Sequence, residues 1–248
     1  MRTDDSAKIA VDGVEERIFR PLLFRALHGA YGNPGIIDEA ARKAVENVRS
    51  DLKQIELRIT PAARLLWGLR TKYFDDAIGK FISKHPLSAV VNVGAGLDTT
   101  FQRVDNGRIR WYDLDLPYVI NLRQKLVPET GRSKCIARSL FDPAWYGEIR
   151  RPKKGVLIFS SNVFSFFQEN EFKSFLSSLA ARFPGGEALF DTSPALGALF
   201  GPSNSAPWDR RIQVLDRFAL PPPTAGEAEA CARELLNACI IFRLLFTS

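Results

Sequence analysis

The stretch from Ser88 to Asp98 constrains the fold of this chain more than any other. Its first part, SAVVNV, is apolar and β-branched and lies between turn-forming residues, which is typical of a buried strand in a parallel sheet. The run then breaks into Gly94-Ala95-Gly96. Two glycines after a strand allow a tight turn and let a ligand lie against the main chain. The pattern is common in nucleotide-binding α/β proteins, but a turn with no ligand could have the same sequence.

The surrounding sequence predicts an α/β protein. The segments 108–115, 134–140, 155–161 and 187–192 are expected strands, of which 155–161 is strongly apolar, and 116–126 and 168–183 are expected helices. Such alternation predicts a mostly parallel sheet with helices on both faces, which binds ligands at the carboxyl ends of its strands. Upstream, helical periodicity runs through 14–28, with an interruption at Pro21, through 36–60, and from Pro61 to about residue 83.

The C-terminal region breaks this regularity. Residues 193–208 are rich in Gly, Pro and Ser, and 220–230 resemble a linker. Residues 231–248 fit either a short amphipathic helix or a strand-like tail. We therefore expect an N-terminal helical cap over 1–85, a ligand-binding α/β domain over 86–220, and an atypical tail over 221–248. On this interpretation the C-terminal part of the sheet is truncated.

Composition excludes several classes of protein. The 34 basic and 28 acidic residues give a net charge of +6, but the basic residues are scattered, which disfavours a nucleic-acid-binding face. Three cysteines and two histidines at unsuitable spacings disfavour a metal site. The first ten residues, MRTDDSAKIA, lack the apolar core of a signal peptide, and no apolar run reaches membrane-spanning length. We expect a cytoplasmic protein with a small-molecule partner, no nucleic acid and no membrane; the sequence does not indicate an oligomeric state.

Two acidic residues narrow the choice of ligand. Asp113 and Asp115 end the second expected strand, 17 and 19 residues after Gly96, where a carboxylate can accept hydrogen bonds from ribose hydroxyls. A dinucleotide fingerprint would have its third glycine at position 99, which is Thr99. That residue disfavours a nicotinamide-dependent dehydrogenase. S-adenosylmethionine also contains a ribose but no phosphate, and does not need the third glycine.

Several motifs, taken together, resemble one family. In order and spacing, LRTKYFDD, VVNVGAGLDTTFQRV, RIRWYDLDLPYVINLRQKL, SLFDPAWYGEI and FSSNVFSFF are similar to the leucine carboxyl methyltransferase family, most closely to its bacterial polyketide-type O-methyltransferases. The resemblance implies a Rossmann-like class I methyltransferase fold. It also implies an S-adenosylmethionine-dependent O-methyltransferase acting on a carboxylate or hydroxyl of a small, polyketide-like molecule.

The resemblance also assigns site residues. Arg70 matches the arginine that pairs with the methionine carboxylate of the cofactor, and Asp115, with Asp113 as alternate, matches the residue that holds the ribose. Ser139 and Leu140 match the pair that flanks the adenine. The expected cofactor-binding residues are Arg70, Gly94, Ala95, Gly96, Asp113, Asp115, Ser139, Leu140 and Ser161.

Some alternatives stay open at this stage. Ser161 stands where the protein-methylating members have a glutamate, so its role is undefined. Arg70 could be a solvated surface charge, the two aspartates could cap the next helix, and the aromatic residues at 165–167 could belong to the acceptor pocket or to the core. No catalytic base is indicated, and a carboxylate acceptor needs none because it is ionised at pH 7. The alternatives to a methyltransferase are a degenerate or truncated cofactor-binding protein and, less favoured, an NAD-dependent dehydrogenase.

Overall fold

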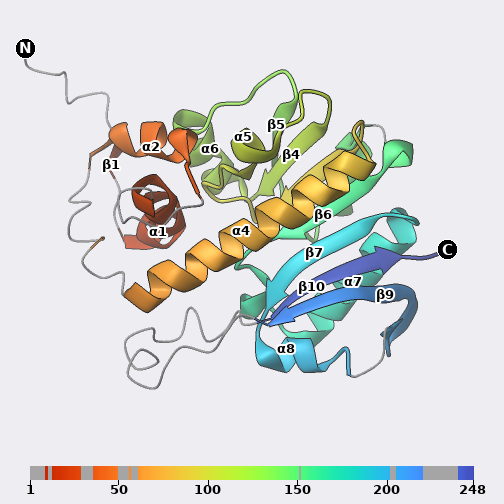
Figure 1. Ribbon diagram of the computed structural model, residues 1–248. Coiled ribbons are helices and arrows are strands. Elements are labelled where there is room, and N and C mark those ends of the chain that lie inside the picture. The colour runs from red at the N-terminus through yellow and green to blue at the C-terminus, as the bar shows by residue number, and fades with distance from the viewer. Residues whose placement is uncertain are drawn as a thin grey trace, which may run out of the picture.

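The computed structural model describes residues 9–10, 13–28, 36–49, 56, 61–150, 152–201, 205–219 and 240–248. Its centre is an eight-stranded sheet in the order β5-β4-β3-β6-β7-β10-β9-β8 (Figure 1). The first five of these strands are parallel: β3 (Ala89–Val93), β4 (Arg110–Asp115), β5 (Ser133–Ala137), β6 (Val156–Ser160) and β7 (Glu187–Thr192). All five coincide with the runs that the sequence predicts as strands.

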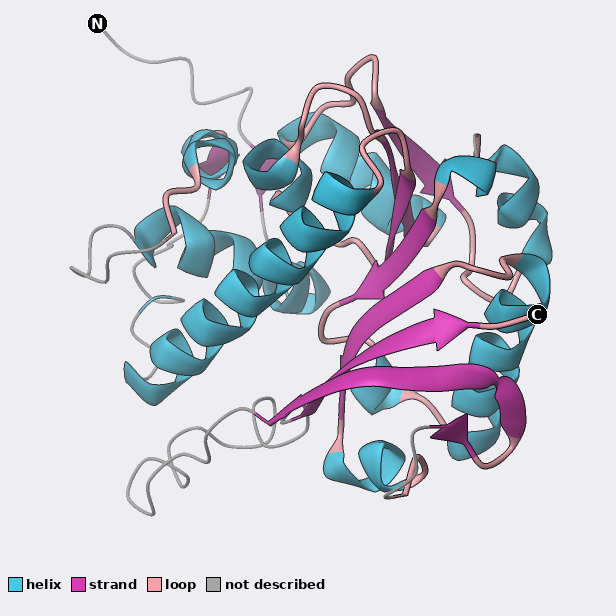
Figure 2. Cartoon of the chain, turned by 45° about the vertical axis from the view of Figure 1, so that its right-hand side comes forward, coloured by secondary structure: helices cyan, strands magenta, loops and turns pink. Residues whose placement is uncertain are grey.

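Helices cover both faces of the sheet (Figure 2). Two consecutive residues of β3 show why both faces need cover. Val91 packs into one buried cluster with α7 (Glu169–Arg182), and Val90 packs into another with α4 (Pro61–Lys84). Successive side chains of a strand point to opposite faces, and all five residues of β3 are buried, so the strand needs cover on both sides. The expected doubly covered α/β architecture is confirmed.

The shorter elements complete the layers. They are α5 (Thr100–Val104), α6 (Pro117–Leu126), α8 (Pro194–Ala198) and the 3₁₀ helices η3 (Pro143–Glu148), η4 (Pro152–Lys154) and η5 (Phe164–Phe166). Each parallel strand therefore returns to the sheet through helical structure, as parallel connections require.

The expectation of a truncated sheet is wrong. β9 (Asp209–Ala219) and β10 (Ile240–Phe246) both join it, and β10 pairs antiparallel with β7 on one side and with β9 on the other. β8 (Ser205–Ala206) adds a short edge. Phe242 and Leu244 of β10 are almost fully buried in the same cluster as α7. The final apolar run is therefore an interior strand, which the preceding proline-rich stretch obscured; residues 220–239 lie outside the described residues.

The N-terminal elements pack beside α4. α1 (Gly13–His28) includes Pro21 without being divided there, and it packs against α2 (Glu39–Glu46) and α4. The single helix expected over 36–60 is wrong in its described part. Asn47 ends α2 by donating from its side chain to the Lys43 carbonyl at 3.1 Å. Residues 48–49 then form β2, which pairs parallel with β1 (Ile9–Ala10).

None of the helices in the described ranges has the length and apolar character needed to cross a membrane.

Candidate active site

A cavity of about 790 Å³ lies where the carboxyl ends of β3, β4 and β6 meet α1 and α4. It occupies the position where open α/β sheets bind their ligands, and its volume is within the range of small-molecule sites. Polar residues lining it include Arg20, Arg25, Arg70, Asn92, Asp98, Arg103, Asp115, Ser161 and Asn162. Gly94, Ala95 and Gly96, expected from the sequence to bind cofactor, also line it.

The two glycines of the loop serve different purposes. Both have a left-handed φ, +67° at Gly94 and +48° at Gly96, a conformation that favours glycine. A Cβ on Gly94 would lie 2.4 Å from Cγ2 of Val163, so the side chain absent there leaves room for a neighbouring loop rather than for a ligand. The main-chain N–H of Gly96 donates to Asp115 Oδ2 at 2.8 Å. The glycine loop is thereby fixed against the ends of both β4 and β6.

The structure separates the two candidate aspartates. Asp115 lines the cavity, and its oxygens accept from the main-chain N–H groups of Gly96 and Leu116. Asp113 is 1% exposed and lies away from the cavity lining, paired with Arg123 at 2.8 Å and accepting from Trp111 Nε1 at 2.9 Å. Burial raises the pKa of both carboxyls. Asp115 is thus placed to contact a ligand, whereas Asp113 is buried in the interior.

Arg70 is not a solvated surface charge. Its side chain is buried and lines the cavity, and its Nη1 donates to Asp191 Oδ2 at 3.0 Å. Asp191 also accepts, through Oδ1, from the main-chain N–H of Asn162 at 2.6 Å. Asn162 is the one described non-glycine residue with a left-handed φ, +63°. Sequence reasoning missed Asp191, because an aspartate near the end of an expected strand gives no signal of its distant partners.

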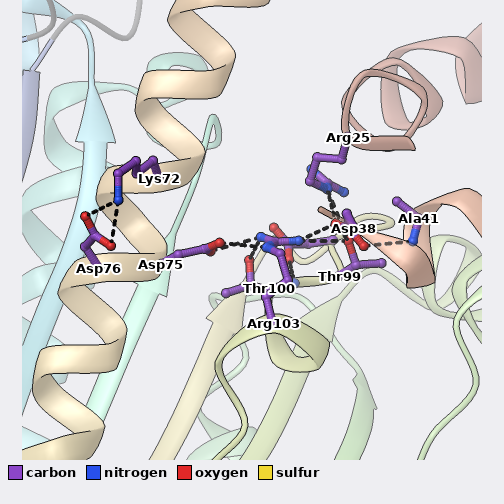
Figure 3. Close-up of polar contacts among 10 residues, drawn as sticks. Arg25, Asp38, Ala41, Lys72, Asp75, Asp76, Thr99, Thr100 and Arg103 are labelled. Carbon is purple, nitrogen blue, oxygen red and sulfur yellow. Dashed lines mark hydrogen bonds and ion pairs between the residues drawn. The ribbon is translucent and has the colours of Figure 1, made fainter. Parts of the chain in front are cut away.

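A buried ionic network joins the N-terminal helices to the glycine loop (Figure 3). We call Arg25, Asp38, Asp75, Thr99 and Arg103 the cap network. Asp38 caps α2 by accepting from Ala41 N–H at 2.9 Å, accepts from the Thr99 hydroxyl at 2.5 Å, and pairs with both arginines. Arg103 of α5 reaches on to Asp75 of α4, with Nε to Oδ2 at 2.7 Å. Three helices are thus held around one carboxylate.

The same arginines set the ionisation of a cavity residue. Burial alone would raise the pKa of Asp98, but the charges of Arg25 and Arg103 and the hydrogen bond from Thr100 outweigh it and lower the pKa below its ordinary value. Asp98 accepts from the main-chain N–H of Thr100 at 2.5 Å. It is therefore an anion at neutral pH, and its lowered pKa makes it a weak base there.

Aromatic side chains form another wall of the cavity. Phe24 of α1 and Trp67 of α4 meet edge to face with ring centroids 5.3 Å apart, and both line it. Phe166 and Tyr118 also line it but are 70% and 58% exposed, which places them at its mouth. Of the stretch 165–167, Ser165 and Phe166 reach the cavity, whereas Phe167 packs against the core.

Of the remaining predicted cofactor-binding residues, one lines the cavity and two do not. Ser161, directly after β6, lines the cavity. Ser139 and Leu140 do not: the Ser139 hydroxyl accepts from Phe141 N–H at 3.2 Å, and Leu140 packs partly buried against the core. They nevertheless follow Arg138, whose main-chain N–H donates to the Asp115 carbonyl at 2.9 Å, so they lie beside the cavity end of β4. Their contact with adenine stays a prediction.

The sequence is similar to one family model and to characterised methyltransferases. The family model of leucine carboxyl methyltransferases matches residues 9–141, more than half of the chain. The tetracenomycin polyketide synthesis O-methyltransferase TcmP of Streptomyces glaucescens is 27% identical over 184 residues, which is 74% of this chain and 67% of that protein. The S-adenosyl-L-methionine-dependent methyltransferase dpfgK of Gibberella zeae is 24% identical, over 76% of this chain and 69% of that protein.

Solved structures share the fold at low identity. A protein from Thermobifida fusca YX assigned as a methyltransferase superposes with a TM-score of 0.53 at 12% identity, over 98% of this chain and 96% of its own. The N-methyltransferase NodS of Bradyrhizobium japonicum WM9, in complex with S-adenosyl-L-homocysteine, superposes with a TM-score of 0.50 at 10% identity, over 84% and 97%. The chain belongs to the leucine carboxyl methyltransferase family and is an S-adenosylmethionine-dependent O-methyltransferase.

Proposed function

We propose that this enzyme methylates a carboxylate of a small aromatic, polyketide-like molecule. The observation that supports this most directly is the make-up of the cavity wall. Among the described lining residues there is no histidine, lysine or cysteine, and the pKa of Asp98, one of the two carboxylates in the wall, lies below its ordinary value. A carboxylate needs no general base at pH 7, because it is already ionised. The similarity to TcmP, a polyketide synthesis O-methyltransferase, supports a polyketide-like acceptor.

The residues present fit S-adenosylmethionine. Arg70 offers a guanidinium for the methionine carboxylate, a pairing suited to its planar donors. Asp115 offers carboxylate oxygens to the ribose hydroxyls, and the turn at Gly94 and Gly96 brings main chain to the cavity surface. When bound, the cofactor supplies a methyl group on a positively charged sulfur. The protein then acts mainly by holding the acceptor oxygen, methyl carbon and sulfur in line, which by itself removes much of the barrier.

The aromatic wall is the proposed acceptor side. Phe24 and Trp67 present apolar ring surface, and Phe166 and Tyr118 extend it to the mouth. Aromatic rings of this kind bind planar aromatic ligands by offset or edge-to-face contact.

The test is methyl transfer from isotopically labelled S-adenosylmethionine to matched pairs of polycyclic aromatic carboxylic acids and phenols, from pH 6 to 9. We expect turnover of the acids at a rate that is nearly independent of pH. Turnover of the phenols alone, rising about tenfold per pH unit below the phenol pKa, would instead assign a hydroxyl acceptor. Trp67→Ala is expected to raise KM for the acceptor, with KM for the cofactor unchanged as the internal control.

The structure removes the reason for considering a degenerate cofactor-binding protein. That alternative depended on missing sheet strands, and β9 and β10 are both present. The dehydrogenase alternative is disfavoured further, because Thr99, at the position of the third glycine of a dinucleotide site, takes part in the cap network.

A further inference from the structure

Asp191 lies just behind the cavity wall and has two partners that belong to the wall. It is the fifth residue of β7, its side chain is fully buried, and it does not itself line the cavity. Its Oδ2 accepts from Arg70 Nη1 at 3.0 Å, and its Oδ1 accepts from Asn162 N–H at 2.6 Å. Both partners do line the cavity. One carboxylate thus contacts two wall residues that come from different parts of the chain.

The contact to Arg70 fixes the direction of the guanidinium. Asp191 occupies one of five N–H donors, and the described residues provide no other hydrogen bond to Arg70. A long side chain held at one end group by a buried anion loses its rotamer freedom before any ligand arrives. The entropic cost of ordering a long side chain of this type is then met in folding rather than in binding.

The contact to Asn162 holds an unusual turn in place. Asn162 has a left-handed φ of +63°, a conformation that asparagine tolerates better than most residues, and it donates its N–H to Asp191. The next residue, Val163, lies against Gly94 of the glycine loop. The position of the 161–163 turn therefore depends on Asp191 from one side and on the glycine loop from the other.

We propose that Asp191 is a positioning residue that aims Arg70 at the amino-acid end of the cofactor and holds the 161–163 turn beside it. The proposal rests on the proposed role of Arg70 in binding the methionine carboxylate. It assigns to Asp191 no contact with the cofactor, so its effect must pass through Arg70 and Asn162.

Two ligands separate this role from a general structural one. S-adenosylhomocysteine has the amino-acid end, whereas 5′-methylthioadenosine has the adenosine and the sulfur but lacks that end. We expect Asp191→Asn to weaken S-adenosylhomocysteine binding about tenfold in calorimetry and to change 5′-methylthioadenosine binding less than twofold. In turnover, KM for the cofactor should rise more than kcat falls. The matched control is Thr192→Val at the next residue, whose buried hydroxyl has no partner among the described residues; it should leave both affinities unchanged.

The double variant keeps the test decisive if Asp191→Asn folds poorly. Arg70→Gln with Asp191→Asn places two neutral partners together, which avoids an unpaired buried charge. If Asp191 acts through Arg70, adding Asp191→Asn to Arg70→Gln costs no further affinity for S-adenosylhomocysteine. Equal losses for both ligands in Asp191→Asn, or full additivity in the double variant, would overturn the positioning role. If Arg70→Gln alone spares S-adenosylhomocysteine, the proposed role of Arg70 fails instead, and the two failures are distinguishable.

Discussion

Replacing Gly94 by alanine tests the packing between the glycine loop and the 161–163 turn. Alanine at φ +67° has a conformational cost of roughly 1–2 kcal/mol. The new Cβ would also meet Val163 Cγ2 at 2.4 Å and Cγ1 at 3.2 Å, and overpacking of this kind costs about 1–3 kcal/mol. We therefore expect Gly94→Ala to lower the free energy of unfolding by roughly 2–5 kcal/mol.

Urea denaturation followed by tryptophan fluorescence measures this loss, provided that the slope m is unchanged. Two other glycines separate the contributions. Gly107 has φ +76° and no atom within 4 Å of the place that a Cβ would occupy, so Gly107→Ala shows the conformational cost alone. Gly131 has neither feature, so Gly131→Ala should change stability by less than about 0.5 kcal/mol.

Val163→Ala provides the decisive background. It removes both γ carbons and leaves its own Cβ 3.4 Å from the Cβ introduced by Gly94→Ala, an ordinary contact. Gly94→Ala should then cost only the conformational contribution, about 1–2 kcal/mol. If Gly94→Ala costs no more than Gly107→Ala, or if Val163→Ala gives no relief, the close packing of the two loops is refuted as the reason for glycine at position 94.

Three further predictions follow from the buried charges and the described thiol. Asp38→Ala leaves two buried guanidiniums without their shared carboxylate and should cost about 3–5 kcal/mol of unfolding free energy. Arg42→Ala breaks only exposed ion pairs and should leave the urea midpoint nearly unchanged. Equal urea midpoints for the two variants would contradict this. Asp113→Asn should lower the urea midpoint and leave the affinity for S-adenosylhomocysteine within about twofold. Asp115→Asn should weaken that affinity about tenfold or more, measured by calorimetry. The reverse result would assign ligand binding to Asp113 instead. Burial raises the pKa of the Cys135 thiol to about 11, so at pH 8 its alkylation, followed by peptide mass spectrometry, should be roughly 200-fold slower than that of a free thiol. Because the folded state favours the protonated thiol, the contribution of Cys135 to stability is full below about pH 8.5 and is lost as the pH rises towards 11. Alkylation of Cys135 at the rate of a free thiol would show that the residue is exposed.

The sequence was sufficient for the parallel part of the sheet. The strands β3, β6 and β7 are short segments with an apolar centre, and every residue in them is buried, as expected for strands covered on both faces. The glycine loop, Asp115 and Arg70 were also predictable, from spacing or from the family resemblance, and all of them line the cavity. These features depend on local pattern or on motifs with fixed order.

The parts that were missed depend on distant partners. The Asp191–Arg70 pair spans 121 residues of sequence, and the Thr99–Asp38 hydrogen bond spans 61, so no local pattern marks either carboxylate. Asn47 ends α2 through one side-chain hydrogen bond inside a segment whose apolar spacing continues as if helical. In β10 the apolar run IIFRLLF was clear, but whether it joined the sheet depended on the open edge of β7, which sequence alone does not display.

The place of β10 has a consequence for folding kinetics. It follows β9 in the chain, yet it lies between β9 and β7 and pairs with both. Until it inserts, the edge of β7 presents unpaired main-chain groups beside a partly formed core, and β9 has no partner on that side. Such edges pair readily with other chains. We expect insertion of β10 to be a late, slow step, and aggregation during refolding to increase with protein concentration until that step is complete.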